Sequence, residues 1–315
     1  MSGEQNPVDT AAAPVSLAPS VQQLDVNGTT LAFRESGQGD PIVLVHGNIS
    51  DMRTWNPLET RLARQFRVIV YSRRYAWPNT PMGAEDDDPW DVQADDLEAL
   101  ITKLELSPTH VVGNSAGSSI ALLLARRRPE LFRTLILEEP PVVSIFLPSN
   151  PPTLTQVLSF LWRHPWDFLP IVKCGAMVIQ PTISAFKRGE NEKALEILVR
   201  GVMGDEYYDE ISEERLEQMR QNLAPHRALL LGSELPSFSE DDAGAILVPT
   251  LFLTGQKTAQ FQKSISRRLT ELMPDAEEIF ISNASHLMHE DNPDATAHEI
   301  VGFIDALRLS PRRTE

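Results

Sequence analysis

The sequence is poor in cysteine and has no long apolar run. Its single cysteine, Cys174, excludes an intramolecular disulfide framework and a cysteine-rich zinc site. No stretch reaches the roughly 18 uninterrupted apolar residues that a membrane-spanning helix requires. Residues 1–20 lack the basic and continuous apolar regions of a secretory signal and are predicted to be a disordered leader. These absences predict a soluble, cytoplasmic protein with no membrane partner.

Positive charge is also scarce. The formal net charge is -16 at pH 7, which argues against unaided nucleic-acid binding because that affinity depends on Lys and Arg side chains that neutralise phosphates. The acidic runs at residues 85–88 and 239–242 lack the ordered spacing of metal ligands and are typical of solvated loops. We therefore predict no metal, no cofactor and no nucleic-acid partner, and expect a small molecule that is neutral or weakly charged.

Strand and helix patterns alternate along most of the chain. Asn27-Gly28 lies between two strand patterns and predicts a hairpin turn, since both residues tolerate positive φ angles. Short apolar runs predict buried parallel strands, and amphipathic segments between them predict helices. The strands are expected at residues 41–47, 67–72, 110–115, 134–139 and 250–255, and the helices at 54–64, 90–104, 117–128, 265–274 and 295–309. This alternation predicts an α/β fold with a doubly wound, mostly parallel sheet.

The alternation stops at residues 142–245, where strand patterns give way to amphipathic helices. Four helices are predicted there, at residues 154–162, 166–177, 193–203 and 212–223. We interpret this segment as a helical lid inserted into a core formed by residues 21–141 and 246–315. Because it lies between two strands, the lid is expected over their carboxyl ends, where open α/β sheets bind ligands.

The segment Gly113-Asn114-Ser115-Ala116-Gly117 has the pattern G-x-S-x-G between a predicted strand and a predicted helix. In that context the serine occupies a sharp turn, and the glycines allow strand and helix to approach closely. The helix that follows offers free N–H groups to an oxyanion. We predict that Ser115 is a nucleophile; the alternative is a Gly/Ser turn without chemistry.

A second motif, Val45-His46-Gly47-Asn48, follows another strand and resembles the oxyanion loop of α/β-hydrolases. The resemblance covers residues 21 to about 146 and 249–309 and leaves the lid outside. It implies that the backbone N–H groups of Asn48 and Ala116 hold the oxyanion. His46 is expected to anchor its own loop rather than to act as a base.

The third motif is the late His286, within the sequence FISNASHLMHEDNP. Its position matches the histidine that completes the catalytic triad of the superfamily, and a neutral imidazole can shuttle a proton near neutral pH. His289 is a rival, but a packing or supporting role suits its place near the next helix better. The other four histidines (His110, His164, His226, His298) have no motif around them and are interpreted as structural.

The triad acid departs from the commonest pattern of the superfamily. Residues 253–259, where most members carry an aspartate, contain no acid. The best candidate is Glu139, just before a proline at the end of the strand that follows the nucleophile helix. This arrangement is similar to that of zearalenone-type lactone hydrolases. Neighbouring strand residues face opposite sides, so only one of Glu138 and Glu139 should reach His286; the sequence leaves open whether it is Glu138, or whether both acids are exposed to solvent.

Two further segments bear on the substrate. Residues 71–78 are aromatic and basic and either edge the pocket or pack under the lid. Several large lid side chains are candidates for an apolar cavity, although ordinary packing accounts for most of them. They are Phe160, Trp162, Trp166, Phe168, Met177 and Phe186.

Together these motifs predict a serine hydrolase that cleaves a carboxylic ester or lactone of a small, apolar molecule through an acyl-enzyme. Two alternatives remain: hydrolysis of a carbon-carbon bond by the same serine, and a hydrolase-fold ligand receptor with little turnover. The substrate's identity does not follow from motifs. The chain is expected to act as a monomer or a homodimer.

Overall fold

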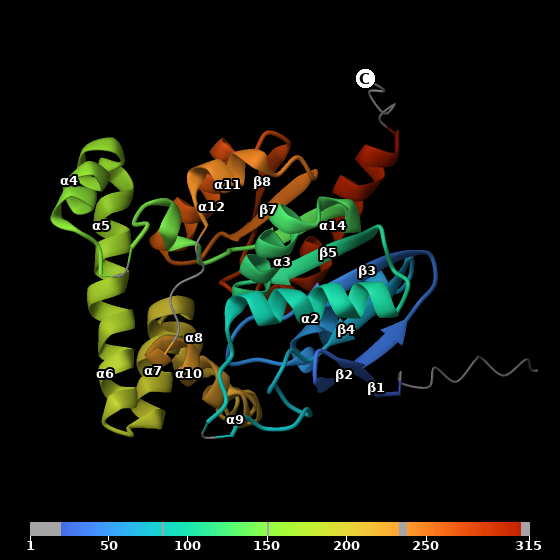
Figure 1. Ribbon diagram of the computed structural model, residues 1–315, viewed down its shortest axis with the longest axis horizontal. Coiled ribbons are helices and arrows are strands. Elements are labelled where there is room, and N and C mark those ends of the chain that lie inside the picture. The colour runs from blue at the N-terminus through green and yellow to red at the C-terminus, as the bar shows by residue number, and fades with distance from the viewer. Residues whose placement is uncertain (1–19, 84, 150, 233–237, 310–315) are drawn as a thin grey trace, which may run out of the picture.

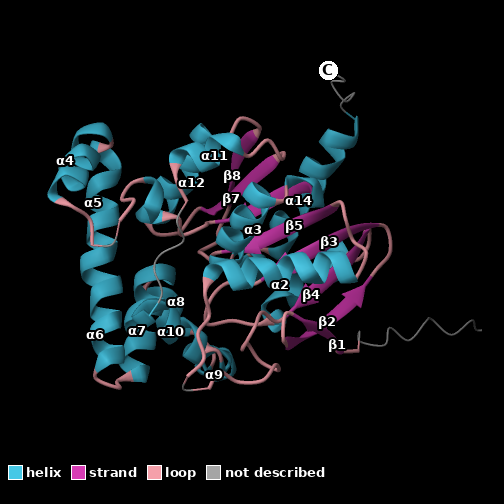
Figure 2. Cartoon of the chain, viewed as in Figure 1, coloured by secondary structure: helices cyan, strands magenta, loops and turns pink. Residues whose placement is uncertain are grey.

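A computed structural model describes residues 20–83, 85–149, 151–232 and 238–309. It contains one eight-stranded sheet between two layers of helices, with a further group of helices at one side (Figures 1 and 2). The strand order is β1-β2-β4-β3-β5-β6-β7-β8. Strands β1, β2 and β4 pair antiparallel, and all other pairs are parallel. The predicted α/β class with a mostly parallel sheet is confirmed.

The strands are β1 (Gln22–Val26), β2 (Thr29–Ser36), β3 (Asp40–Val45), β4 (Phe66–Tyr71), β5 (Thr109–Asn114), β6 (Phe132–Glu138), β7 (Thr250–Gly255) and β8 (Ala276–Ile281). The helices beside the sheet are η1 (Met52–Trp55), α1 (Asn56–Leu62), α2 (Trp90–Lys103), α3 (Ala116–Arg127), η2 (Pro129–Leu131), α12 (Gln260–Leu272), α13 (Met288–Asp291) and α14 (Pro293–Leu309). The predicted hairpin is present, and both turn residues have positive φ, 39° at Asn27 and 75° at Gly28.

The parallel strands bury both faces, which accounts for their uninterrupted apolar sequences. On β3, Val43 and Val45 face one core with α2, α3 and α12, whereas Ile42 and Leu44 face the other core with α1 and α14. This division follows from the alternation of side chains along a strand. The carboxyl ends of the strands consequently lie at fixed positions between two packed layers.

Between β6 and β7, the described residues form helices rather than strands. They are η3 (Val143–Ile145), α4 (Leu154–Arg163), α5 (Pro165–Cys174), the π-helical turn η4 (Gly175–Ile179), α6 (Gln180–Lys187), α7 (Asn191–Met203), α8 (Asp205–Glu210), α9 (Glu213–Gln221), α10 (Leu223–Gly232) and α11 (Glu240–Ala245). We call residues 142–245 the helical insertion. Periodicity predicts four of its helices, but it does not predict α6, α8, α10 and α11.

The helical insertion has a core of its own. Phe186, Leu195 and Met219, from three different helices, are buried together. Ile49, from the loop after β3, is buried in the same cluster. The loop after β3 and the insertion are therefore packed as one unit, so that the position of one constrains the position of the other.

Candidate active site

The serine of the G-x-S-x-G motif lies on a strained turn between β5 and α3. Ser115 has φ 50° and ψ -117°, a conformation that L-residues rarely adopt, and its N–H donates to Glu138 O at 2.7 Å. A Cβ added at Gly117 would lie 2.0 Å from Val45 O, and one at Gly113 would lie 2.6 Å from Ser118 N. Only glycine fits at either position, which is the steric reason for the motif.

The loop after β3 lies directly against this turn. A Cβ added at Gly47 would be 3.1 Å from Ser115 Cβ. Among the described residues, neither the N–H of Asn48 nor that of Ala116 has a hydrogen-bond partner. The two predicted oxyanion donors are thus both unengaged, one at the start of α3 and one on the adjoining loop.

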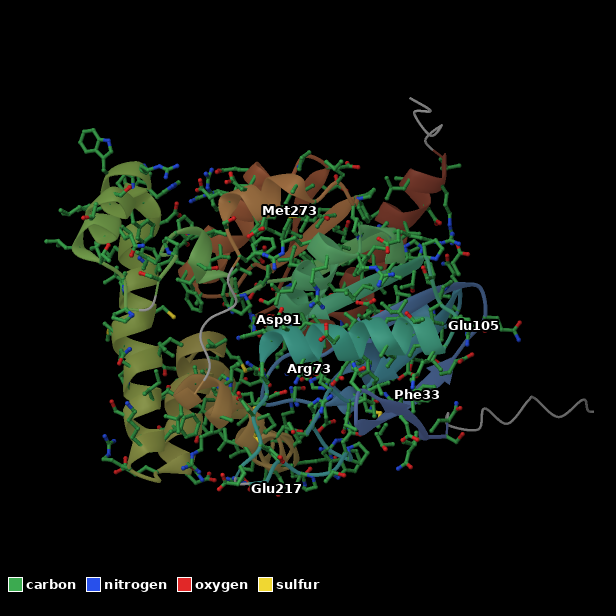
Figure 3. All side chains as sticks on the ribbon, in the orientation of Figure 1. Phe33, Arg73, Asp91, Glu105, Glu217 and Met273 are labelled. Carbon is green, nitrogen blue, oxygen red and sulfur yellow. The ribbon has the colours of Figure 1, made fainter. Side chains whose placement is uncertain are left out.

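Arg73 holds the loop after β3 in place (Arg73 is labelled in Figure 3). The guanidinium is buried, and its Nη2 donates to Gly47 O at 3.0 Å and to Asn48 Oδ1 at 2.9 Å. The sequence left open whether residues 71–78 edge the pocket or pack under the lid. One of them, Arg73, places a positive charge behind the loop after β3. No sequence signal pointed to this contact, because it joins the ends of β4 and β3.

His46 anchors the same loop, as expected. Its Nε2 accepts the N–H of Arg73 at 2.9 Å, so the ring proton is on Nδ1, which donates to Gly47 O at 2.8 Å. Complete burial, and next the charge of Arg73, lower the pKa of His46 to about 3. A histidine that stays neutral and has both nitrogens engaged cannot serve as a second base.

This buried histidine predicts a loss of stability in acid. Unfolded His46, with a pKa near 6.5, takes up a proton as the pH falls, whereas the folded form does not until about pH 3. The free energy of unfolding should therefore fall by about 2 kcal/mol between pH 7 and pH 5 from this group alone. Urea unfolding of wild type and His46→Gln at pH 7 and pH 5 measures this loss of stability. If the free energy of unfolding falls equally in both proteins between these pH values, the prediction is contradicted.

His286 is bonded to Glu139. Its Nδ1 lies 2.6 Å from Glu139 Oε2, and both side chains are buried. Glu139 has φ 48° at the end of β6, and its Oε1 accepts the N–H of Gly255 at 2.8 Å. A carboxylate at this distance fixes the proton on Nδ1 and leaves Nε2 as the acceptor.

Thr258 and Gln262 complete the surroundings of the acid. The Thr258 hydroxyl donates to Glu139 Oε2 at 2.8 Å and also contacts the Gln262 amide, which lies 2.6 Å from His286 Nδ1. Gln262 Nε2 faces His286 Nδ1, and Gln262 Oε1 faces Thr258. Because Thr258 and Nδ1–H each donate their one proton to Glu139, the opposite assignment of the amide oxygen and nitrogen satisfies both contacts. Residues 253–259, which contain no acid, thus supply through Thr258 a neutral hydrogen bond to Glu139.

Glu138 pairs with the other histidine of the motif. Its Oε2 lies 2.6 Å from His289 Nδ1, and His289 Nε2 lies 2.9 Å from Thr54 Oγ1. The ring of Trp55 packs 4.2 Å from the His289 ring. Neighbouring acids therefore serve two different histidines, and the alternative in which both acids are exposed is wrong, because Glu138 and Glu139 are fully buried.

Asn114 joins the elbow to the histidine loop. Its Nδ2 donates to His286 O at 3.1 Å and to Glu138 Oε2 at 3.1 Å. Since Ser115 is the next residue, this side chain fixes the loop of His286 relative to the serine. The x position of a G-x-S-x-G motif carries no such information in the sequence.

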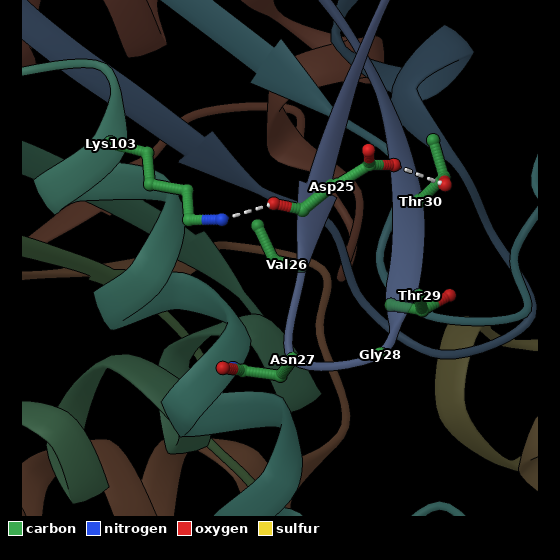
Figure 4. Close-up of a pocket in the computed structure, with 7 residues that line it drawn as sticks. All are labelled: Asp25, Val26, Asn27, Gly28, Thr29, Thr30 and Lys103. Carbon is green, nitrogen blue, oxygen red and sulfur yellow. Dashed lines mark hydrogen bonds between the residues drawn. The ribbon is translucent and has the colours of Figure 1, made fainter.

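The large side chains of the insertion do not gather around the site as a group. Phe160 and Phe186 are buried and Phe168 is half-buried, but Trp162, Trp166 and Met177 are exposed. A hollow of about 300 Å³ lies at the β1–β2 hairpin and not beside Ser115. Its lining includes Asp25 and Lys103 (Figure 4). Lys103 Nζ donates to Asp25 O at 2.6 Å across this hollow. Within the described residues, no three His, Cys, Asp or Glu side chains are grouped to hold a metal.

Comparison with known proteins places this geometry in a family. The model of the alpha/beta hydrolase family matches residues 42–299. A 2-(acetamidomethylene)succinate hydrolase from Mesorhizobium japonicum is 25% identical over 292 residues, which are 90% of this chain and 95% of that protein. A thermophilic esterase from Thermogutta terrifontis has a TM-score of 0.70 at 20% identity, over 91% of this chain and 99% of its own.

A third similar protein, the enol-lactonase from Burkholderia xenovorans, has a TM-score of 0.68 at 18% identity, over 90% of this chain and 100% of its own. At these identities, the structural likeness shows a shared fold. The family model covers well over half of the chain and supports a hydrolase activity. The chain belongs to the alpha/beta hydrolase family.

Proposed function

We propose that this protein hydrolyses a carboxylic ester or lactone of a small molecule through an acyl-enzyme on Ser115. The observation that carries the proposal is the buried Glu139–His286 pair, fixed by Asn114 beside the strained Ser115 turn. A histidine with Nδ1–H held by a carboxylate is suited to take a proton through Nε2.

The proposed reaction has two stages. Ser115 Oγ attacks the carbonyl carbon while His286 Nε2 takes its proton, and the N–H groups of Asn48 and Ala116 stabilise the oxyanion, each by about 3 kcal/mol. The intermediate collapses, and the leaving alkoxide receives the proton from His286. Water, deprotonated by His286, then attacks the acyl carbon, and the acid product leaves as Ser115 regains its proton. Glu139 stays ionised throughout and stabilises the imidazolium. No step requires a metal or cofactor.

Several observations support this substrate class. The similar proteins include an esterase and an enol-lactonase. The relative from Mesorhizobium is named for a succinate that bears an acetamidomethylene group, so an amide-bearing substrate belongs among the test compounds. The insertion follows β6 and shares a buried cluster with the oxyanion loop, which favours its role as a lid. A cytoplasmic location and a monomeric or homodimeric state stay predictions.

A substrate panel tests the proposal. Esters with acyl chains from acetyl to octanoyl, small and macrocyclic lactones, 2-(acetamidomethylene)succinate and a vinylogous 1,5-diketone are compared by kcat/KM. We expect turnover of an ester or lactone, and its loss in Ser115→Ala. Turnover of the diketone alone would instead assign carbon-carbon bond hydrolysis, and binding without turnover would indicate a receptor.

A further inference from the structure

One side of the helical insertion exposes an unusual number of large apolar side chains. We call α4, α5, η4 and α6, residues 154–187, the arm; Figure 1 shows it along the edge of the molecule opposite β1. Trp162 and Trp166, on either side of the turn between α4 and α5, are each 87% exposed. The exposed apolar residues of the arm are Leu154, Leu158, Leu161, Trp162, Trp166, Leu169, Val172 and Met177. Monomeric soluble proteins rarely expose so large a cluster without a function.

The exposed apolar residues follow helical spacing within each helix, as Trp166, Leu169 and Val172 do on α5. Leu154, Leu158 and Leu161 follow one another at helical spacing along α4, while Phe160 points inward and packs 5.0 Å from Phe146. On α5, Ile171 is buried in the main core. The arm is thus apolar on both its inner and its outer face, a pattern expected of a helix in contact with apolar material on both sides.

The buried contacts of the arm limit how it could bind a membrane. The most apolar 18-residue window of the continuous helix Pro165–Lys187 has a mean hydropathy of 1.3, and 22% of that window is buried. By length and composition alone, the helix could span a bilayer. Ile171 belongs to the main core and Phe186 to the core of the insertion. Spanning would pull both from their clusters, so the arm can lie on a membrane surface but not cross it without unfolding.

The charge of the arm differs in sign from the rest of the chain. Three basic residues, Arg163, Lys173 and Lys187, stand against one acid, Asp167, which gives the arm a net charge of +2. The whole chain carries a net charge of -16, so the residues outside the arm carry -18. Asp167 is itself buried and paired with Arg267. Arg163 pairs with Glu240 outside the arm at 3.4 Å, whereas Lys173 is exposed at the end of α5. The arm is thus weakly cationic on an otherwise acidic protein.

We propose that the outer face of the arm docks on an anionic lipid surface. The exposed leucines enter the boundary of the acyl chains, Trp162 and Trp166 lie at the headgroup level, and Lys173 contacts lipid phosphates. The acidic remainder is repelled by the same surface and orients the body away from it. That repulsion also disfavours a second copy of the chain as the occupant, because two bodies of this charge would be brought together.

The inference is independent of the proposed reaction, and it revises the expectation of no membrane partner.

Vesicle sedimentation with the full chain tests the proposal. We expect binding to vesicles with about 30% phosphatidylglycerol in phosphatidylcholine, weaker binding to pure phosphatidylcholine, and release at high salt. The double variant Trp162→Ser/Trp166→Ser should lower the partition coefficient by about tenfold or more. Lys173→Glu should weaken binding to the anionic vesicles only.

Phe280→Ser is the matched control, since Phe280 on β8 is 55% exposed but lies outside the arm, and we expect its binding to match wild type. Tryptophan emission should shift to the blue with anionic vesicles, and the double variant should lose the shift. Equal, low binding to both kinds of vesicle would overturn the proposal. So would a lipid-free dimer, measured by sedimentation velocity, that the double tryptophan variant dissociates, because the face would then belong to a second copy.

Discussion

Ser115→Ala is expected to lower kcat for an ester by about 10⁴-fold or more while the protein stays folded. Alanine removes only the hydroxyl oxygen that would attack the substrate. The strained backbone at φ 50° is held by β5, α3 and the bond to Glu138 O, none of which involves that hydroxyl. Steady-state kinetics on the best ester of the panel, with circular dichroism of the same sample, gives the result.

Ser119→Ala provides the control for this variant. Ser119 lies one turn further along α3, and its buried hydroxyl has no hydrogen-bond partner in the described part of the chain. Its removal should leave kcat within about twofold of wild type, since no hydrogen bond is lost. Retention of more than a trace of activity in folded Ser115→Ala would show that another residue is the nucleophile.

Glu139→Gln is expected to lower kcat by about a hundredfold or more. The amide has nearly the same shape and can still accept the N–H of Gly255. It carries no charge, however, to stabilise the imidazolium that forms during attack. If its NH2 faces Nδ1, the proton of His286 moves to Nε2, and the base is lost. Kinetics at a saturating ester concentration separates this loss of kcat from any change in binding.

Glu138→Gln is the comparison that makes the assignment specific. Glu138 is as buried as its neighbour, but it bonds to His289 and Asn114 rather than to His286. We expect a much smaller loss of kcat together with a lower free energy of unfolding, since a buried carboxylate and histidine lose their pairing. The opposite ranking of the two variants in kcat would assign the triad acid to Glu138 and leave Ser115 and His286 in place.

The sheet was largely predictable from the sequence. The buried strands β3, β5 and β7 are short apolar runs with glycine or asparagine at or near their ends, a pattern typical of parallel strands that are covered on both faces. The helices of the insertion were harder to predict from the sequence. The helix α10 contains a proline near its start and ends at a glycine, and α8 has six residues, so neither shows a clear apolar stripe.

The site was predictable where chemistry demands a residue type and not where tertiary structure supplies a partner. Glu139 could be proposed because the usual acid position is empty. The role of Thr258 could not, because its bond to Glu139 joins segments more than 100 residues apart. Gln262 could not either, because no motif marks its contact with His286. The exposure of Trp162 and Trp166 could not be predicted either, since composition does not tell which face of a helix in the insertion contacts solvent.

If Ser115 is an activated nucleophile, a fluorophosphonate should react with it selectively. The protein is treated with a small alkyl fluorophosphonate, digested, and read by tandem mass spectrometry. We predict one phosphonate per chain, on Ser115, with labelling strongly slowed in Glu139→Gln and unchanged in Ser119→Ala. An unlabelled protein that is still active on esters, or a label on another residue, would contradict the account.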